Sequence, residues 1–204
     1  MKLFRRGPDD GVTDRWLIAG LGNPGERYAG TRHNAGAMVL DQLVEESGSS
    51  LKRHKSGCVI AETNLGGARV VLARPLAFMN ESGRPIRELA RWYKIPVDRV
   101  VVVHDELDLP FGDVRVKMGG GLAGHNGLRS IVNHLGSKDF ARVRIGISKP
   151  PGRKQGTDHV LDEFDSRERR DLPEVIDRAA HAVERILEAG FERAMNEVNT
   201  RTTG

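Results

Sequence analysis

The feature that most constrains this chain is a connection at residues 20–36 that holds five glycines and two asparagines. It follows a short apolar run, Trp16–Ala19, and precedes an amphipathic segment that starts at Ala37. Glycine and asparagine tolerate positive φ angles or offer hydrogen-bonding groups without bulk. This composition favours a loop shaped around a ligand rather than a core segment. The single histidine of the loop, His33, is a candidate for chemistry.

Short apolar runs that end in polar or glycine-rich turns predict buried strands of a largely parallel sheet at Trp16–Ala19 and Val100–Val103. The turn sequence Asn64–Gly67 predicts a hairpin between Cys58–Thr63 and Arg69–Ala73. Two further strands are predicted at Val114–Met118 and Ala141–Ser148.

Helices are predicted at Ala35–Ser47, Ser82–Tyr93, Asn126–Leu135 and Asp171–Gly190. In the last of these we expect Asp171 to be the N-cap, Pro173 to lie in the first turn and Gly190 to end the helix. Asn80 or Ser82 is expected to cap the second helix. The alternation of strands and helices predicts a single three-layer α/β domain, with a twisted mixed, largely parallel sheet flanked by helices.

The 204 residues suffice for one sizeable domain, which we expect at residues 15–200. Residues 1–14 have no apolar run, so we expect a disordered extension and not a secretory signal. The single cysteine, Cys58, excludes a disulfide framework and fits packing in a reducing compartment. Because no apolar stretch approaches the ~20 residues of a membrane span, we expect a cytoplasmic protein. The net charge of +4 is compatible with an anionic partner, although many small proteins are mildly basic.

The loop at residues 20–36 contains the glycine pattern of a dinucleotide-binding site, Gly20-Leu-Gly-Asn-Pro-Gly25, directly after a predicted strand. A dinucleotide site needs a helix that begins at the glycines, so that its N-terminus faces the pyrophosphate. Here the polar run Glu26–Arg32 follows, and apolar periodicity starts only near Ala35. The acidic residue at a suitable distance, Asp41, falls inside the predicted helix. The pattern therefore argues against NAD binding.

A second candidate is His104-Asp-Glu-Leu-Asp108, at the end of a predicted strand. These groups suit a divalent cation, but neighbours on an extended segment point to opposite faces. A strand-end Asp is also well placed to orient a histidine from another loop. We favour this role for Asp105 over metal binding, and simple capping of a turn stays open.

Two further segments are candidates for ligand contact. The run Gly119–Gly127 places His125 and Asn126 where a predicted helix begins, with Lys117 just before the glycines. The alternative is a flexible surface loop with solvated charges. Phe78-Met79-Asn80 is either a binding wall with an amide or core followed by a cap.

Five segments, in order along the chain, closely resemble the signatures of bacterial-type peptidyl-tRNA hydrolase. They are Gly20–Gly25 with Tyr28 and Thr31–Gly36, Phe78–Gly83, His104–Pro110, Gly124–Leu128 and Arg144–Ile147. The resemblance covers roughly residues 16–195. It implies a monomeric α/β globule that hydrolyses the ester between a peptide and tRNA, releasing reusable tRNA, with no cofactor, no metal and no obligate protein partner.

The resemblance also implies roles for particular residues. His33 matches the general base that activates water, Asp105 its orienting carboxylate, and Asn23 the residue that separates peptidyl- from free aminoacyl-tRNA. Substrate-binding positions are matched by Tyr28, Phe78, Asn80 and Asn126. The basic positions that grip acceptor-stem phosphates are matched by Lys117, His125 and Arg144.

Two departures from the family pattern stand out. Leu122-Ala123 replaces the more usual polar-Gly pair after the three glycines, and residues before Trp16 form an unusual extension. The basic segment 149–157 is a candidate lid. A non-catalytic RNA-binding relative is the main alternative function, and the presence of His33, Asp105 and Asn23 together favours catalysis over it.

Overall fold

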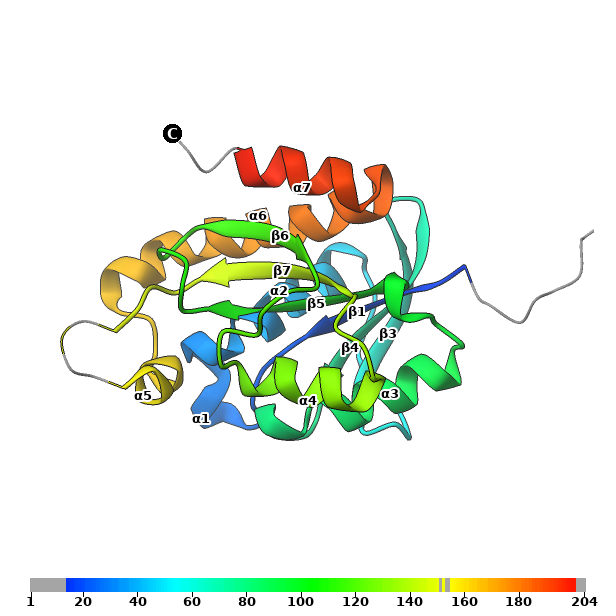
Figure 1. The fold of residues 1–204 in the computed structure, drawn as a ribbon, viewed down its shortest axis with the longest axis horizontal. Helices are drawn as coiled ribbons and strands as arrows, with labels where there is room; N and C mark the ends of the chain where they lie inside the picture. The colour runs from blue at the N-terminus through cyan, green and yellow to red at the C-terminus, as the bar shows by residue number, and fades with distance from the viewer. Residues whose placement is uncertain (1–13, 151, 153–154, 201–204) are drawn as a thin grey trace, which may run out of the picture.

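The computed structural model describes residues 14–150, 152 and 155–200 of the chain (Figure 1). The predicted extension at residues 1–14 lies outside them, apart from Asp14, and so does part of the segment 149–157. No helix in the described part of the chain is long and apolar enough to cross a membrane.

One mixed sheet organises the described chain, in the order β2-β3-β4-β1-β5-β7-β6. Its strands are β2 (Lys52–Arg53), β3 (Cys58–Leu65), β4 (Ala68–Pro75), β1 (Trp16–Gly20), β5 (Val100–Glu106), β7 (Ala141–Gly146) and β6 (Val114–Met118). The four central strands β4, β1, β5 and β7 run parallel, whereas β2, β3 and β6 pair antiparallel at the two edges. The mixed, largely parallel α/β sheet is thus confirmed.

The β3–β4 hairpin is confirmed with a two-residue turn, Gly66-Gly67. Both glycines have positive φ, of 51° and 76°, as the tight hairpin turn requires. β5 extends to Glu106, three residues past the predicted strand end at Val103, so His104 and Asp105 belong to the strand itself.

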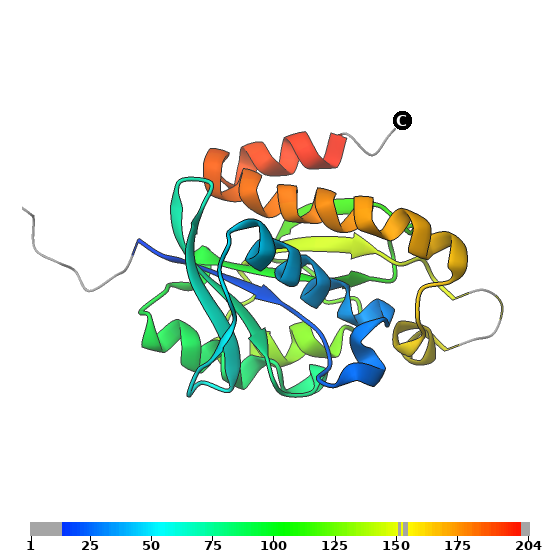
Figure 2. The same cartoon turned by 180° about the vertical axis from the view of Figure 1, so that it is seen from behind.

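Helices cover both faces of the sheet. They are α1 (Glu26–Ala29), α2 (Ala35–Glu46), α3 (Gly83–Trp92), α4 (Asn126–Leu135), α5 (Gly156–Leu161), α6 (Ser166–Ala189) and α7 (Phe191–Thr200), with 3₁₀ turns η1 (Arg32–Asn34), η2 (Met79–Glu81) and η3 (Val97–Arg99). One core joins α2 and α6 to one face (Figure 2), and a second core joins α3 and α4 to the other (Figure 1). The three layers follow the prediction.

Two predicted caps are wrong. α6 begins at Ser166, five residues before the expected N-cap Asp171, because Asp165 and Glu168 form a reciprocal capping box there. Pro173 consequently lies inside the helix. At α3 neither Asn80 nor the Ser82 side chain caps the helix; the Gly83 N–H donates instead to the Ser130 hydroxyl of α4, at 2.9 Å. The short elements α1, α5, α7 and β2 were not predicted.

The start of α2 lies directly against the ends of β1 and β5. A Cβ atom at Gly36 would lie 2.2 Å from the Val103 carbonyl oxygen and 2.8 Å from the Leu21 nitrogen. Only glycine allows this approach, which sets η1 and its histidine beside the carboxyl end of β5. In open α/β sheets, ligands bind at the carboxyl ends of the strands, where the connections diverge.

Candidate active site

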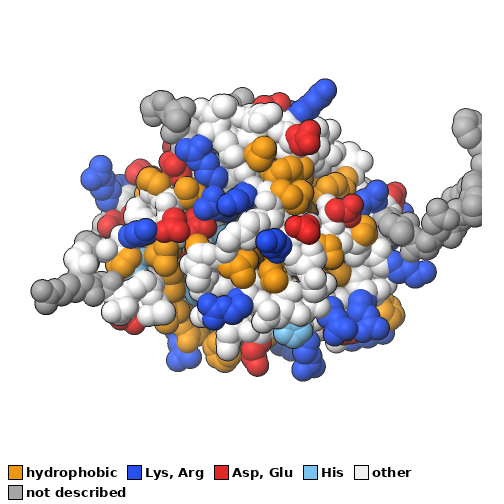
Figure 3. Space-filling view, viewed as in Figure 1, with side chains coloured by type: hydrophobic (Ala, Val, Ile, Leu, Met, Phe, Trp, Pro, Cys, Tyr) orange, Lys and Arg blue, Asp and Glu red, His pale blue; other side chains and the backbone are white. Residues whose placement is uncertain are grey.

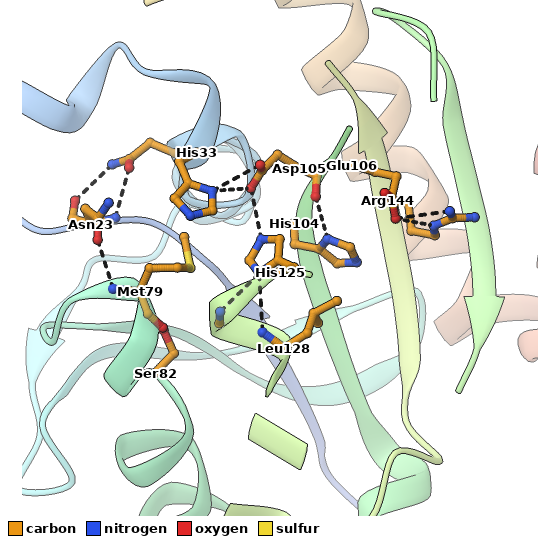
Figure 4. A network of polar contacts seen from close by, with 12 residues as sticks. Asn23, His33, Met79, Ser82, His104, Asp105, Glu106, His125, Leu128 and Arg144 are labelled. Carbon is orange, nitrogen blue, oxygen red and sulfur yellow. Dashed lines mark hydrogen bonds and ion pairs between the residues drawn. The ribbon is translucent and has the colours of Figure 1, made fainter. Parts of the chain in front are cut away.

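His33 and Asp105 meet at the carboxyl end of β5 (Figure 4). His33 Nδ1 lies 2.9 Å and 3.0 Å from the two carboxylate oxygens of Asp105. Because a carboxylate only accepts, Nδ1 carries the proton and donates it to Asp105. The other ring nitrogen, Nε2, then has a free lone pair, which is the form of imidazole that can take a proton from water.

The segment carrying His33 is anchored by its neighbour Arg32. The Arg32 backbone N–H donates to the Asp162 carbonyl at 3.0 Å, and its guanidinium donates to the Glu163 carbonyl at 2.8 Å. The same guanidinium forms an ion pair with Glu168 on α6. Bonds from both backbone and side chain fix the position of η1, so His33 approaches Asp105 from a rigid support.

His125 is the second histidine on Asp105. Its Nδ1 accepts from the backbone N–H groups of Gly127 and Leu128, at 3.1 Å and 3.3 Å, as the N-cap of α4. Since Nδ1 is an acceptor, Nε2 carries the proton and donates it to Asp105 Oδ1 at 3.1 Å. The helix terminus therefore fixes the tautomer of His125.

This placement departs from the role that the resemblance implies for His125. Both ring nitrogens bond within the protein, and the side chain is 7% exposed. A phosphate grip would need a free, accessible imidazolium N–H, and the structure gives His125 none. Its contacts are those of a group that holds Asp105.

Asp105 is buried at 2% exposure. Burial alone raises the pKa of a carboxyl, but His33 and His125 outweigh it, and they hold the pKa of Asp105 well below its usual range. Behind them lies His104, whose Nδ1 is 2.7 Å from the Asp105 carbonyl oxygen. Burial, followed by the neighbouring His125, lowers the pKa of His104 well below its ordinary value. Asp105 is therefore a fixed negative charge that faces two donor imidazoles.

Asn23 is held by two neighbours in the loop after β1 (Figure 4). The Asn34 side chain forms a pair of bonds with the Asn23 backbone, at 2.9 Å and 3.0 Å. The Asn23 side-chain oxygen accepts from the Met79 N–H at 2.8 Å. Because Oδ1 already accepts a hydrogen bond, the hydrogens on the amide nitrogen Nδ2 are the groups that Asn23 can offer to a ligand. Asn23 thus presents a donor.

The predicted substrate-binding residues do not all line one cleft. Asn126 lies with His33, Asp105 and His125 around a narrow cleft of about 70 Å³. Tyr28 and Phe78 pair edge-to-face at 6.3 Å between ring centroids, and Phe78 is 47% exposed. Asn80 instead lines a separate hollow with Arg84 and His134.

The basic strands contain one residue that sequence reasoning missed. Arg144 bonds Glu106, with Nε and Nη2 at 3.1 Å and 3.0 Å from Oε2. Across the β6–β7 pairing, exposed Lys117 lies opposite Arg142, which is buried at 1% exposure. Burial first, and then the neighbouring Arg144, lowers the pKa of Arg142.

The Arg142 guanidinium lies under the glycine run. Its Nη1 donates to the Gly121 carbonyl at 2.9 Å, while Nε and Nη2 have no partner among the described residues. A Cβ atom at Gly120 would lie 2.9 Å from Lys117 Nζ and 3.3 Å from Arg142 Nη2, so both cations border this glycine. A buried, incompletely paired guanidinium is costly and favours an anion nearby.

The segment after residue 149 also reaches the site. Gly156 and Thr157, at the start of α5, line the cleft with His33. His159 of the same helix is tied to the Ile147 carbonyl, 3.1 Å from its Nε2. The described part of the candidate lid thus forms one wall of the cleft, and its closure over substrate stays a prediction.

His33, Asp105 and His125 offer three potential metal-ligand atoms that lie within 4.8 Å of one another. In the observed arrangement both histidines direct an N–H at Asp105. A cation at this point would have to replace both protons.

The sequence assigned no specific role in this network to Asn34, Met79, His104, Glu106 or Arg142. Four of them lie in candidate segments: Asn34 in the Gly/Asn-rich loop of His33, Met79 beside Asn80, and His104 and Glu106 on either side of Asp105. Arg142 alternates with Arg144 along its strand, which indicates a basic surface but not its burial.

Comparison with known proteins places the chain among characterised sequences. Residues 17–204 match the family model described as peptidyl-tRNA hydrolase. The chain is 58% identical to a peptidyl-tRNA hydrolase of Frankia casuarinae over 181 residues, which is 89% of this chain and 92% of that protein. A peptidyl-tRNA hydrolase of Mycobacterium avium is 53% identical, with 90% of this chain and 96% of that one covered. The crystal structure of peptidyl-tRNA hydrolase from Acinetobacter baumannii superposes with a TM-score of 0.85 at 39% identity, covering 92% of this chain and 96% of that one.

Proposed function

Because this chain belongs to the peptidyl-tRNA hydrolase family, whose members are hydrolases acting on peptidyl-tRNA, we propose that it cleaves the peptide–tRNA ester by general-base catalysis at His33. The single observation that carries this proposal is the pair of short contacts from His33 Nδ1 to Asp105. These contacts leave the second ring nitrogen of His33, Nε2, unprotonated and able to act as the base. His33 lines the narrow cleft at the carboxyl end of β5.

In this mechanism His33 Nε2 takes a proton from water as the water oxygen attacks the ester carbonyl. Asp105 stabilises the imidazolium that forms and keeps the ring in one orientation. The tetrahedral intermediate then collapses, the C–O bond to the ribose breaks, and the proton passes to the leaving 3′- or 2′-oxygen. General-base catalysis of this kind contributes roughly 10²–10⁴-fold.

Asn23 is the proposed selector of the peptide. Its Nδ2 is a hydrogen-bond donor, because Met79 occupies Oδ1. A donor matches a peptide carbonyl oxygen, whereas the free ammonium of an aminoacyl-tRNA offers only donors and meets no acceptor there. Buried groups left without a partner discriminate strongly between substrates.

Asn126, rather than Asn80, is the proposed hydrogen-bond donor to the oxyanion of the tetrahedral intermediate. Asn126 lines the cleft with His33, while Asn80 lines a separate hollow. An oxyanion donor is worth about 3–4 kcal/mol in acyl-transfer enzymes. Half-buried Tyr28 and exposed Phe78 form an aromatic pair that suits contact with the substrate.

Lys117 and Arg144 are the proposed phosphate grip, and Arg142, buried beneath the glycine run, adds positive charge behind them. Glu106 neutralises Arg144, so Lys117 and Arg142 supply the uncompensated charge. Such contacts depend on charge and shape rather than base sequence. The proposed partner is therefore tRNA, contacted by the aromatic pair Tyr28 and Phe78 and by the basic residues of the phosphate grip. Action as a monomer in the cytoplasm, without cofactor or obligate protein partner, belongs to the same proposal.

The test is release of labelled peptide from N-acetyl-aminoacyl-tRNA by the wild type and by His33→Ala. We expect wild-type turnover and a loss of at least about 10²-fold in the variant. His181→Ala is the matched control, because His181 is 54% exposed on α6, away from the cleft. Full activity of His33→Ala would refute the mechanism. Wild-type binding of tRNA without turnover would favour the alternative of a non-catalytic RNA-binding relative.

A further inference from the structure

A row of arginines lies along the exposed face of α3. Arg84, Arg87 and Arg91 are exposed and are spaced three and four residues apart, so they share one side of the helix. The opposite side is buried against the sheet through Ile86 and Leu89. Figure 3 shows Lys and Arg side chains gathered over α3, at the lower right of the view.

Lys55, which precedes β3, extends this row. Its Nζ lies 3.4 Å from the centre of the Trp92 ring, at the end of α3. Together Arg84, Arg87, Arg91 and Lys55 form what we call the α3 basic strip. Contact of a cation with an indole face is favourable, and it keeps the ammonium at the surface.

Little on the protein neutralises the strip. Among the described residues Arg84, Arg87 and Lys55 form no ion pair, and Arg91 contacts only Glu88, at 3.7 Å on the surface. A surface pair of this kind contributes little to stability. The hollows beside the strip are lined by three carboxylates, Glu81, Glu88 and Glu62, and Glu62 is paired with Arg15. Against Glu81 and Glu88, the four cations leave the strip positive.

An exposed aromatic accompanies the charges. Trp92 is 55% exposed, and the His54 ring approaches it edge-on at 5.7 Å. Hollows of about 370 Å³ and 560 Å³ lie on the two sides of Trp92. A positive groove combined with an exposed aromatic ring is the usual composition of surfaces that follow a nucleic-acid backbone.

The strip begins outside the His33 cleft, beside the turn that orients Asn23. Met79, whose N–H orients Asn23, belongs to the 3₁₀ turn just before α3. A hollow of about 410 Å³ lined by Asn80 and Arg84 shares Ser56 with the hollow at Trp92. From Arg84 to Arg91 the helix rises about 10 Å. The strip thus leads away from the site over the face that α3 and α4 cover.

We propose that the α3 basic strip binds the phosphodiester backbone of the RNA substrate beyond its 3′ end. The inference rests on the proposed function, since it places the reacting 3′ end at His33. Arginines three and four residues apart on a helix have Cβ atoms about 5–6 Å apart and therefore form one row of cations, and a polyanion with regularly repeated charges matches such a row. An acidic protein partner would fit the charge, but base stacking on an exposed aromatic ring such as Trp92 favours a nucleic acid.

The test compares two substrates. One is full-length N-acetyl-aminoacyl-tRNA, and the other is the same acyl group on a 3′-terminal trinucleotide, which has only two phosphodiester groups to offer the strip. For the triple variant Arg84→Gln, Arg87→Gln, Arg91→Gln we expect KM for full-length substrate to rise about tenfold at roughly 0.1 M salt. The slope of log KM against log salt should fall by about two to three. The values of kcat, and of kcat/KM for the trinucleotide, should stay at the wild-type level.

The matched control removes three cations from the other face of the sheet. Arg167, Arg170 and Arg193 are exposed on α6 and α7, and their replacement by Gln changes the net charge equally. This control should keep the wild-type KM and salt slope. If the two triple variants behave alike, the strip does not bind RNA. If neither substrate is cleaved by the wild type, the proposed function fails, which is a different result.

A direct readout is the fluorescence of Trp92. The chain has two tryptophans, so Trp16→Phe leaves Trp92 as the reporter. Titration with deacylated tRNA at low salt should change its emission, with a midpoint that the α3 triple variant shifts to higher concentration. Unchanged emission at saturating tRNA overturns the proposal. Competition by an acidic polypeptide as effective as tRNA would assign the strip to a protein partner instead.

Discussion

The two contacts of His125 can be separated by two substitutions at the same position. His125→Ala removes the N-cap of α4 and also the bond to Asp105. His125→Asn removes only the second, because an asparagine oxygen can accept from the same two N–H groups, Gly127 and Leu128, but is too short to reach Asp105. Comparing the two variants therefore separates the effect of the N-cap from the effect of the hydrogen bond to Asp105.

The magnitudes follow from the bonds involved. Loss of an N-cap costs about 1 kcal/mol, and loss of a hydrogen bond to a charged group costs about 1.5–3 kcal/mol. The Ala variant should lose both amounts, and the Asn variant only the second. We therefore expect the Asn variant to be about 1 kcal/mol more stable than the Ala variant, which is a difference of roughly 2–4 °C in Tm for a chain of this size.

The assay is thermal and urea unfolding of both variants, followed by peptide release at a temperature where both are folded. Turnover should fall equally in the two, since Asp105 loses the same donor in each. Equal Tm values would refute the cap. If turnover were lower in the less stable Ala variant than in the Asn variant, the loss would follow stability and not the contact with Asp105. That result would refute the assignment of His125 to the carboxylate.

Three shorter predictions concern other buried groups. The folded-state pKa of Asp105 lies below its unfolded value of about 3.9, so its stabilising contribution is complete above that pH and is lost as the pH falls through the folded-state pKa; acid titration of unfolding should show a shallower loss for Asp105→Asn than for the wild type. Burial raises the pKa of Cys58 to about 11, so a thiol reagent at pH 8 should label the native protein slowly and the denaturant-unfolded protein at once, and fast native labelling contradicts its packing role. Arg142→Met should keep or raise the unfolding free energy by about 1 kcal/mol, because it removes an incompletely paired buried cation. It should also weaken tRNA binding as Lys117→Ala does, and unchanged KM and salt slope would remove Arg142 from the grip.

Much of the fold was predictable because its signals are local. The apolar runs at Trp16–Ala19 and Val100–Val103 and the Gly66-Gly67 turn each determine their own element. The start of α6 was also readable from Asp165 and Glu168. It was missed because apolar periodicity begins only at Val175, and the turns before it are polar.

In the candidate site, the contact between His33 and Asp105 agrees with the orienting role expected of that carboxylate, whereas the contacts of His125 and Arg142 were not predictable. His33, Asp105 and Asn23 follow from motifs in segments that loops and strand ends present. The role of His125 depends on which nitrogen the α4 terminus occupies, and that requires the distance from α4 to β5. Burial of Arg142 depends on a loop whose glycines let the backbone cover it. Neither relation is a property of local sequence.

Asp105 joins the two helical layers across the sheet edge. One histidine reaches it from the α2 side. The other reaches it from the α4 side, and its second ring nitrogen accepts the amide protons of Gly127 and Leu128, the second and third residues of the helix that it caps. Deuterium uptake at the Gly127 and Leu128 amides is therefore coupled to the hydrogen bonding of the carboxylate. The exchange rates of these two amide protons therefore report on the hydrogen bonding of Asp105. They can be measured with substrate or product bound, and without a substitution in the site.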